Sequence, residues 1–81
     1  MSLHRNEKEI LRVLFKEGRA LTLQEIAIDA GMSWLTVKKY VKVMEDKKLV
    51  SETKDSKRTK YQIEPELLEA LSRRKNEAHQ Q

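Results

Sequence analysis

Cysteine is absent from this 81-residue sequence, and glycine and proline are scarce. Without cysteine the chain has no disulfide, no thiolate nucleophile and no cysteine-ligated zinc, as expected for a cytoplasmic protein. Two glycines and one proline cannot supply a glycine-rich phosphate-binding loop or a flexible linker. No apolar run approaches the roughly 18 residues that a membrane helix needs. The N-terminus also lacks the apolar core of a signal peptide.

Catalytic and metal-binding patterns are missing as well. The two histidines, His4 and His79, lie near opposite ends of the chain. No nucleophile–base pair or carboxylate pair has the spacing of a known catalytic motif. We therefore expect no enzyme, no metal site and no cofactor. With 81 residues the chain has room for one domain around one small core.

Positive charge is concentrated in one part of the chain. The net charge is +4, but residues 34–60 contain nine lysines and arginines against four acidic residues, a local balance of +5. The other 54 residues contain eight basic and nine acidic groups, a balance of −1. Any solvent-exposed face can carry lysines, but a one-sided basic patch more often faces an anionic partner, most commonly nucleic acid.

Apolar spacing predicts a first helix from Glu7 to Glu17. Asn6 is a suitable N-cap, with Glu9 three residues later closing a capping box, and Gly18 is a suitable C-terminal stop. The stripe facing the core is formed by Ile10, Leu14 and either Leu11 or Val13. The next three residues, 19–21, form either a short strand or an extended link.

Two further helices follow, separated by a turn. Thr22 caps the second helix with Glu25 as its capping-box partner, and its apolar face is formed by Leu23, Ile26, Ala27 and Ala30. Gly31 makes the turn, because glycine adopts the left-handed conformation without steric cost. Ser33 caps the third helix, whose buried stripe is Val37, Val41 and Met44.

A basic hairpin and a last helix complete the pattern. One strand runs from Leu49 to about Lys54, residues 55–58 are turn-forming, and a second strand returns over residues 59–64 with Tyr61 and Ile63 on one face. Pro65 fits the first turn of a helix. That helix carries an apolar patch formed by Leu67, Leu68 and Leu71.

The run LTLQEIAIDAGMSWLTVKKYVKVMEDKKLV, followed by SETKDSKRTKYQI, resembles the winged helix–turn–helix family of DNA-binding domains. The resemblance implies a mainly α fold with a small β-hairpin, in a single winged-helix domain over residues 1–81. The helix–turn–helix spans residues 22–47, the wing residues 49–64 and the C-terminal helix residues 65–78. Trp34 and Leu35 depart from the family pattern because polar residues are common there, and Lys48 stands where glycine is frequent.

In this family the third helix enters the major groove, so the resemblance implies sequence-specific binding to double-stranded DNA and a role in transcription regulation. Lys38 and Lys39 are the expected base readers, because lysine can donate to guanine O6 and N7. The full set of expected DNA-binding residues is Gln24, Ser33, Trp34, Leu35, Thr36, Lys38, Lys39, Tyr40, Lys42, Lys54, Lys57, Arg58 and Lys60.

Several of these residues have two interpretations. The basic wing residues either lie on phosphates, with Arg58 entering a narrow minor groove, or only protect a strand edge from pairing. Gln24 either clamps a phosphate at a helix N-terminus or is simply solvated. Trp34 either covers the joint between the second and third helices or is exposed to DNA or a partner protein. Tyr40 is expected to be half-buried, with its hydroxyl free for a phosphate.

The last helix raises the question of assembly. Its leucines can be covered by the first helix of the same chain or by a second copy, and we favour a homodimer suited to a palindromic operator. The rival function is a protein–protein interaction module within a nucleic-acid-processing assembly. Exposed Trp34 and Leu35 would support that rival, whereas the lysines of the third helix and wing favour DNA.

Overall fold

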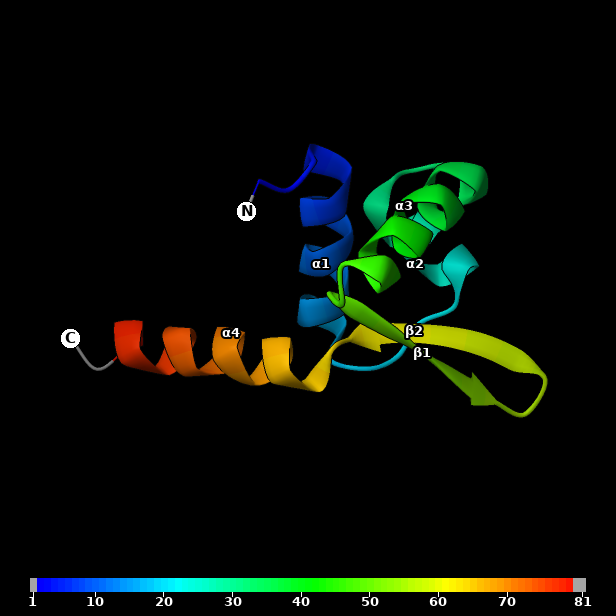
Figure 1. The fold of residues 1–81 in the computed structure, drawn as a ribbon. Helices are drawn as coiled ribbons and strands as arrows, with labels where there is room; N and C mark the ends of the chain where they lie inside the picture. Colours follow the sequence, from blue (N-terminus) through cyan, green and yellow to red (C-terminus); the bar gives the residue numbers. More distant parts are fainter. Residues whose placement is uncertain (1, 80–81) are drawn as a thin grey trace.

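Four helices and one hairpin follow one another in the computed structural model, which describes the backbone of residues 2–79 and the side chains of residues 2–74 (Figure 1). The elements are α1 (Arg5–Glu17), α2 (Leu23–Ala30), α3 (Trp34–Asp46), β1 (Val50–Asp55), β2 (Arg58–Ile63) and α4 (Pro65–His79). The first three helices pack together, the hairpin extends from one side of them, and α4 projects from the other side. The predicted fold class, mainly helical with a small hairpin, is confirmed.

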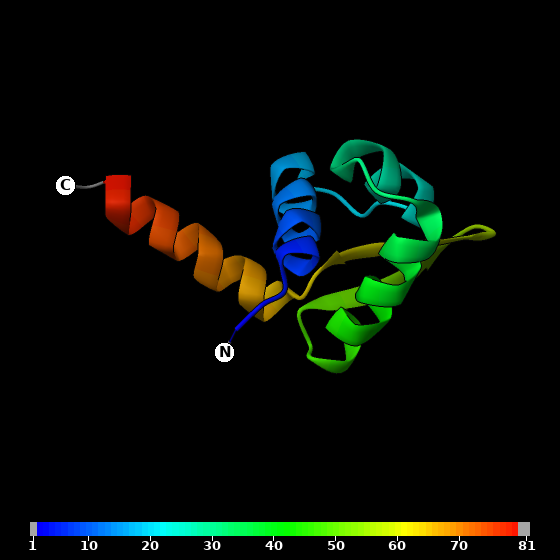
Figure 2. The same cartoon turned by 90° about the horizontal axis from the view of Figure 1, so that it is seen from above.

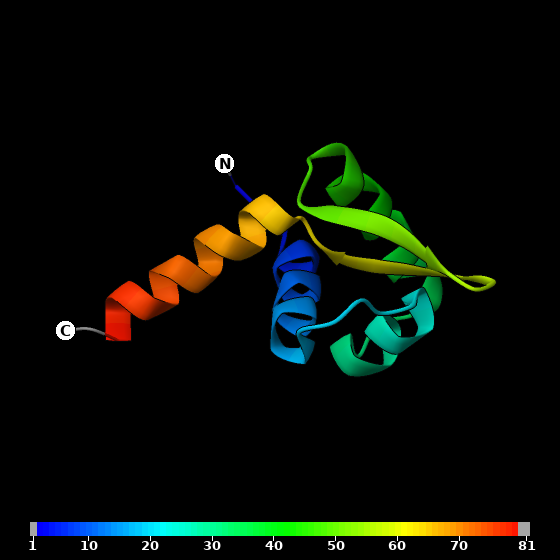
Figure 3. The same ribbon diagram turned by 90° about the horizontal axis from the view of Figure 1, so that it is seen from below.

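The hydrophobic core lies between α1, α2, α3 and the base of the hairpin, as the views from above and below show (Figures 2 and 3). Each helix contributes the side chains that recur every three or four residues, because these share one face of a helix. The buried apolar residues are Ile10, Val13, Leu14, Leu21, Ile26, Ala27, Val37, Val41, Met44, Val50 and Ile63. Of the two alternatives on α1, Val13 is buried and Leu11 is half-buried.

The start of α1 differs from the prediction. The helix begins at Arg5 with His4 as its N-cap, and Glu7 closes the capping box. The Nδ1 atom of His4 accepts from the Asn6 backbone amide at 3.0 Å, and the His4 amide donates to Glu7 Oε1 at 2.9 Å. The predicted pairing of Asn6 with Glu9 was therefore wrong by two residues. Histidine is an uncommon cap, and its ring nitrogen takes the place of the expected side-chain oxygen.

The turn between α2 and α3 follows the prediction. Thr22 and Glu25 form the expected capping box, with backbone-to-side-chain distances of 2.9 and 3.2 Å. Gly31 ends α2 in the left-handed conformation at φ 66°, and Ser33 caps α3. The direction of α3 relative to α2 is thus fixed by local hydrogen bonds as well as by the core.

At the other end of α3, Lys48 takes the left-handed conformation at φ 60°. The Leu49 amide bonds back to the Met44 carbonyl at 2.9 Å, which closes the last turn of the helix. This geometry explains why glycine is frequent at the position in the family, because a side chain there carries a steric cost. Lysine is tolerated since its long side chain points into solvent.

The hairpin is antiparallel, with Val50 opposite Ile63 at its base and Asp55 opposite Arg58 at its tip. A two-residue turn joins the strands, and Ser56 supplies the positive φ, 61°, that such tight turns need. Leu21 pairs with Tyr61 through backbone hydrogen bonds of 2.9 and 2.7 Å. Of the two alternatives for residues 19–21, the extended link is the one found, with this single bridge to the hairpin.

A buried ion pair joins α1 to the end of α3. Only 3% of Glu7 is exposed, and its carboxylate accepts from Lys47 Nζ at 2.9 and 3.1 Å. Burial alone would raise the pKa of Glu7, but the hydrogen bonds from the His4 amide and the Lys47 ammonium outweigh it, so the pKa is lowered. Lys47 therefore stabilises the fold, although by its position in the sequence it is one of the nine basic residues of 34–60.

We predict that Glu7→Gln destabilises the fold by about 1–3 kcal/mol near neutral pH, because it removes the charge that binds Lys47. A carboxyl whose native pKa is lowered stabilises the fold above its ordinary value, here 4.5, and loses that contribution as pH falls through the native pKa. Denaturation midpoints measured at a series of pH values should show the gap between wild type and variant closing in acid. Glu66→Gln, an exposed position, is the control. A gap independent of pH would contradict this role.

Candidate nucleic-acid interface

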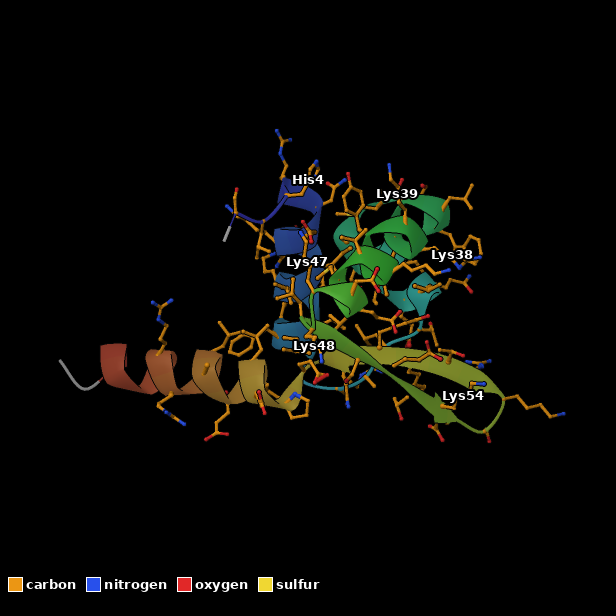
Figure 4. The ribbon with its side chains drawn as sticks, in the orientation of Figure 1. His4, Lys38, Lys39, Lys47, Lys48 and Lys54 are labelled. Atoms are coloured by element: carbon orange, nitrogen blue, oxygen red, sulfur yellow. The ribbon has the colours of Figure 1, made fainter. Side chains whose placement is uncertain are left out.

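The outward face of α3 carries three lysines. Val37, Val41 and Met44 point into the core, which leaves Lys38, Lys39 and Lys42 exposed on the opposite side. Figure 4 shows Lys38 and Lys39 extending from α3 away from α1, while Lys47 lies between α1 and α3. The helical period therefore separates the apolar stripe from the cationic one on the same helix.

Most cations of this region are not neutralised by the protein. Among residues 2–74, the structure shows ion pairs of Lys47 with Glu7 and of Lys60 with Asp55, the latter at 3.3 Å. No salt bridge is found in that part of the chain for seven others, although the charge of Lys42 acts on Glu45: Lys38, Lys39, Lys42, Lys48, Lys54, Lys57 and Arg58. Three of them lie on α3 and three at the end of the hairpin. We call these six residues the basic face; Lys48 lies apart from them, beside Glu64, Glu66 and Leu67 (Figure 4).

Trp34 stands at the first position of α3 and is not part of the core. Its side chain is 46% exposed, so it does not fill the joint between α2 and α3. The ammonium of Lys38 lies 5.0 Å from the centre of its ring. Trp34 also borders an open hollow of about 330 Å³ between the start of α2 and the hairpin, lined by Thr22, Gln24, Trp34, Arg58 and Thr59.

That hollow brings together residues from three predicted contact regions. Gln24 is exposed in the first turn of α2, Trp34 begins α3, and Arg58 begins β2. Polar groups from a helix N-terminus and a cationic wing residue can both bind backbone phosphates. The geometry is thus compatible with a DNA backbone passing between α3 and the hairpin.

The N-terminal cap of α3 uses the two hydroxyls that were predicted to contact DNA. Ser33 Oγ accepts from the Thr36 amide at 3.1 Å and donates to Thr36 Oγ1 at 2.8 Å. Ser33 is exposed and Thr36 half-buried. Both residues therefore fix the start of the helix, and their remaining hydrogen-bonding capacity faces outward.

The hydroxyl of Tyr40 already has a partner within the protein. It lies 3.3 Å from His4 Nε2, and the two rings are 4.9 Å apart between centres. Because His4 Nδ1 accepts a hydrogen bond, the ring proton is assigned to Nε2, which donates to the tyrosine oxygen. Tyr40 is half-buried as predicted. Its oxygen accepts from His4, a contact that no signal in the sequence indicates, and its O–H proton remains able to donate to a phosphate.

Two apolar side chains beside the turn are open to solvent. Leu35 is 69% exposed, as expected for its place on the outer face of α3. Ile28, at the end of α2, is 72% exposed and was not among the predicted surface residues. Its helical position, next to buried Ala27, could have indicated this exposure, because neighbours in a helix point about 100° apart.

The core covers only part of the leucine patch that α4 carries. Leu67 and Leu71 pack against the core of the same chain, whereas Leu68 is 40% exposed. A shallow groove of about 240 Å³ runs along the helix, lined by Leu67, Ala70, Leu71, Arg73 and Arg74. Beyond its first turns α4 extends away from the other helices (Figure 1). The same chain thus covers Leu67 and Leu71 in part and leaves Leu68 exposed.

The described residues contain neither a membrane-spanning helix nor a cluster of metal ligands. In residues 2–79 no helix has the length and apolar character required to cross a membrane. Within the same part of the chain, no three His, Cys, Asp or Glu side chains are grouped so that they could hold a metal ion.

A known protein family matches most of the helical part of the chain. A family model described as winged helix-turn-helix DNA-binding matches residues 3–51, which is more than half of the chain. That region contains α1, α2, α3 and the start of β1. Among curated proteins, none matches the sequence.

Solved structures of regulators share the fold. The homodimeric winged helix-turn-helix domain of a possible ArsR-family regulator from Mycobacterium bovis is 21% identical with a TM-score of 0.69, over 90% of this chain and 69% of that one. MepR, a transcription regulator from Staphylococcus aureus, is 23% identical with a TM-score of 0.74, over 98% and 62%. A predicted DNA-binding transcriptional regulator from E. coli is 25% identical with a TM-score of 0.74, over 90% and 77%. The chain thus spans under two thirds of MepR.

Proposed function

The chain belongs to the winged helix–turn–helix family of DNA-binding domains, and we propose that it binds specific sites in double-stranded DNA to regulate transcription. In this proposal α3 enters the major groove and the hairpin, the wing of the fold, lies on the backbone or in the minor groove. Domains of this family bind DNA and are not enzymes, in agreement with the sequence analysis. We also propose a cytoplasmic location, in keeping with the absence of cysteine.

The observation that carries the proposal is the basic face. Six cations that form no salt bridge in residues 2–74 lie on α3 or at the end of the hairpin. Elsewhere in that range Arg12, Arg19 and Arg73 are paired with glutamates. Apart from Lys48, the cations there that form no salt bridge, Arg5, Lys8, Lys16 and Arg74, lie on α1 and α4 and not on α3 or the hairpin. Unpaired cations on one face attract the phosphate backbone and release its counterions.

Base recognition is proposed for the exposed lysines in the first half of α3. An α-helix fits the major groove, where each base pair presents a distinct pattern of donors and acceptors. Lys38 lies about one turn into the helix and Lys39 is the next residue. Both can donate to guanine O6 and N7. Leu35 can contact a thymine methyl, and Lys42 and Lys54 lie where phosphates would pass.

The function is tested by binding to random-sequence duplex DNA across a salt series, followed by selection of preferred sites. We expect salt-sensitive binding that enriches one sequence, because phosphate contacts weaken as salt rises while base contacts select. Undetectable binding at low salt would overturn the proposal. It would favour a protein partner instead, with exposed Ile28 and Leu35 as the first surface to test.

Lys38→Ala and Lys39→Ala should each weaken binding to the selected site by about 1–3 kcal/mol and relax the preference at one base position. Neither lysine packs in the core, so the fold should remain intact. Competition between the selected site and its single-base variants measures the effect. Unchanged preference in both variants would show that this face of α3 does not read bases.

Lys57→Ala should reduce the slope of log K against log salt by about 0.9, the value for one phosphate contact, without changing base preference. Lys60→Ala is the matched variant on the same hairpin. It should have a smaller effect, because Lys60 is already paired with Asp55. Equal slopes for the two variants would contradict the assignment of the unpaired residues as the phosphate contacts.

We further propose that two copies associate through α4. The exposed Leu68, the groove beside Leu67 and Leu71, and the homodimeric state of the similar domain from Mycobacterium bovis support this assembly. A two-fold dimer would present two copies of α3 to a palindromic site.

Leu68→Lys should shift the protein toward the monomer, because it places a charge in an apolar contact, and should weaken binding to a palindrome more than to a half-site. Light scattering coupled to size exclusion measures the mass. Glu66→Lys, exposed on the same helix, is the control that adds a lysine outside the leucine patch. A wild-type protein that is monomeric at all accessible concentrations would rule the dimer out.

A further inference from the structure

Trp34 and Lys38 form a contact that places the lysine before any DNA is present. They lie four residues apart on α3, so they share one face of the helix. Lys38 Nζ is 5.0 Å from the ring centre, inside the range of about 6 Å for a cation–π contact. We propose that Trp34 is a positioning residue for Lys38 and sets the strength of its base preference, an inference that rests on the proposed function.

The surroundings of the ring support positioning over packing. Trp34 is 46% exposed and is absent from the buried core. It stands at the edge of the hollow that Gln24 and Arg58 also line, between the start of α2 and the hairpin. The ring therefore lies at the boundary between the helix predicted to read bases and the wing predicted to hold the backbone.

A fixed ammonium discriminates better than a mobile one. Lys38 has no acidic partner in residues 2–74, so the ring is the group that restrains it there. A lysine loses rotamer freedom when it binds, and a contact that holds it beforehand lowers that loss. A free lysine also reaches nearby phosphates, which carry no sequence information. An ammonium held in one place favours the base whose acceptors lie there.

Two neighbouring lysines provide comparisons. Lys39 lies 5.7 Å from the ring of Tyr40, which itself contacts His4. Lys42 is also exposed on α3 and has no ring contact among residues 2–74. Lys42 is therefore the internal control for a lysine on the same helix that no aromatic ring restrains.

The contact is tested first in the free protein by NMR. The ring current of Trp34 should shift the ε-methylene protons of Lys38 upfield of those of Lys42. Trp34→Leu should remove that difference, and Trp34→Phe should retain part of it. Coincident Lys38 and Lys42 shifts in the wild type would overturn the proposal, because the ammonium would then not be held by the ring.

The effect on recognition is tested by a ratio of affinities. Lys38→Met identifies the base position that Lys38 reads, because the variant loses the preference at that position. The ratio is the affinity for the preferred duplex divided by the affinity for a duplex altered only at that position. Trp34→Leu should lower the ratio about 2- to 5-fold, the worth of an exposed cation–π contact. Trp34→Phe should largely retain it, since it keeps an aromatic face. Uniform weakening of binding cancels in this ratio.

The double variant separates positioning from direct contact. In the Lys38→Met background, Trp34→Leu should leave the ratio unchanged, because no ammonium remains to be positioned. A further fall in the double variant would overturn the proposal and show that Trp34 reads DNA itself. If the wild type prefers no base at any position, the proposed function fails. The NMR result on the free protein does not depend on DNA, so it tests the contact between Trp34 and Lys38 separately.

Discussion

The burial of one stripe of α3 determines what the rest of the molecule can do. Val37, Val41 and Met44 enter a core shared with α1, α2 and the base of the hairpin. Because a helix has 3.6 residues per turn, burying that stripe turns the intervening lysines outward. The position of Lys38 and Lys39 in solvent is thus a consequence of core packing, and a loss of packing would rotate the basic face as well.

Polar contacts with α1 reinforce this orientation at two points along α3. Lys47 is tied to the buried carboxylate of Glu7, just past the end of the helix, and Tyr40 is tied to His4 near its middle. His4 and Glu7 also form the capping box of α1. One short segment therefore both starts α1 and anchors the helix proposed to read DNA. A buried pair of this kind is costly to break, because the remaining charge would be unpartnered.

The sequence predicted the parts of the fold that local chemistry determines. The cap at Thr22, the left-handed Gly31 and the stripe of α3 have short-range signals, and each is found in the structure. The start of α1 was missed because a histidine nitrogen serves as the cap. The roles of Lys47 and Tyr40 were missed because their partners, Glu7 and His4, are 40 and 36 residues away. The charged residues could be counted from the sequence. Only the fold shows which of them form no salt bridge.

We propose that α3 and the hairpin together form the surface that meets duplex DNA. An NMR titration of the protein with a selected duplex, followed through backbone amide and lysine side-chain signals, tests this assignment. We expect the largest changes on residues 34–42 and 54–58, with small changes on the middle of α1 and on α4. Changes centred on α4 or on the outer face of α1, with those two regions unaffected, would contradict it.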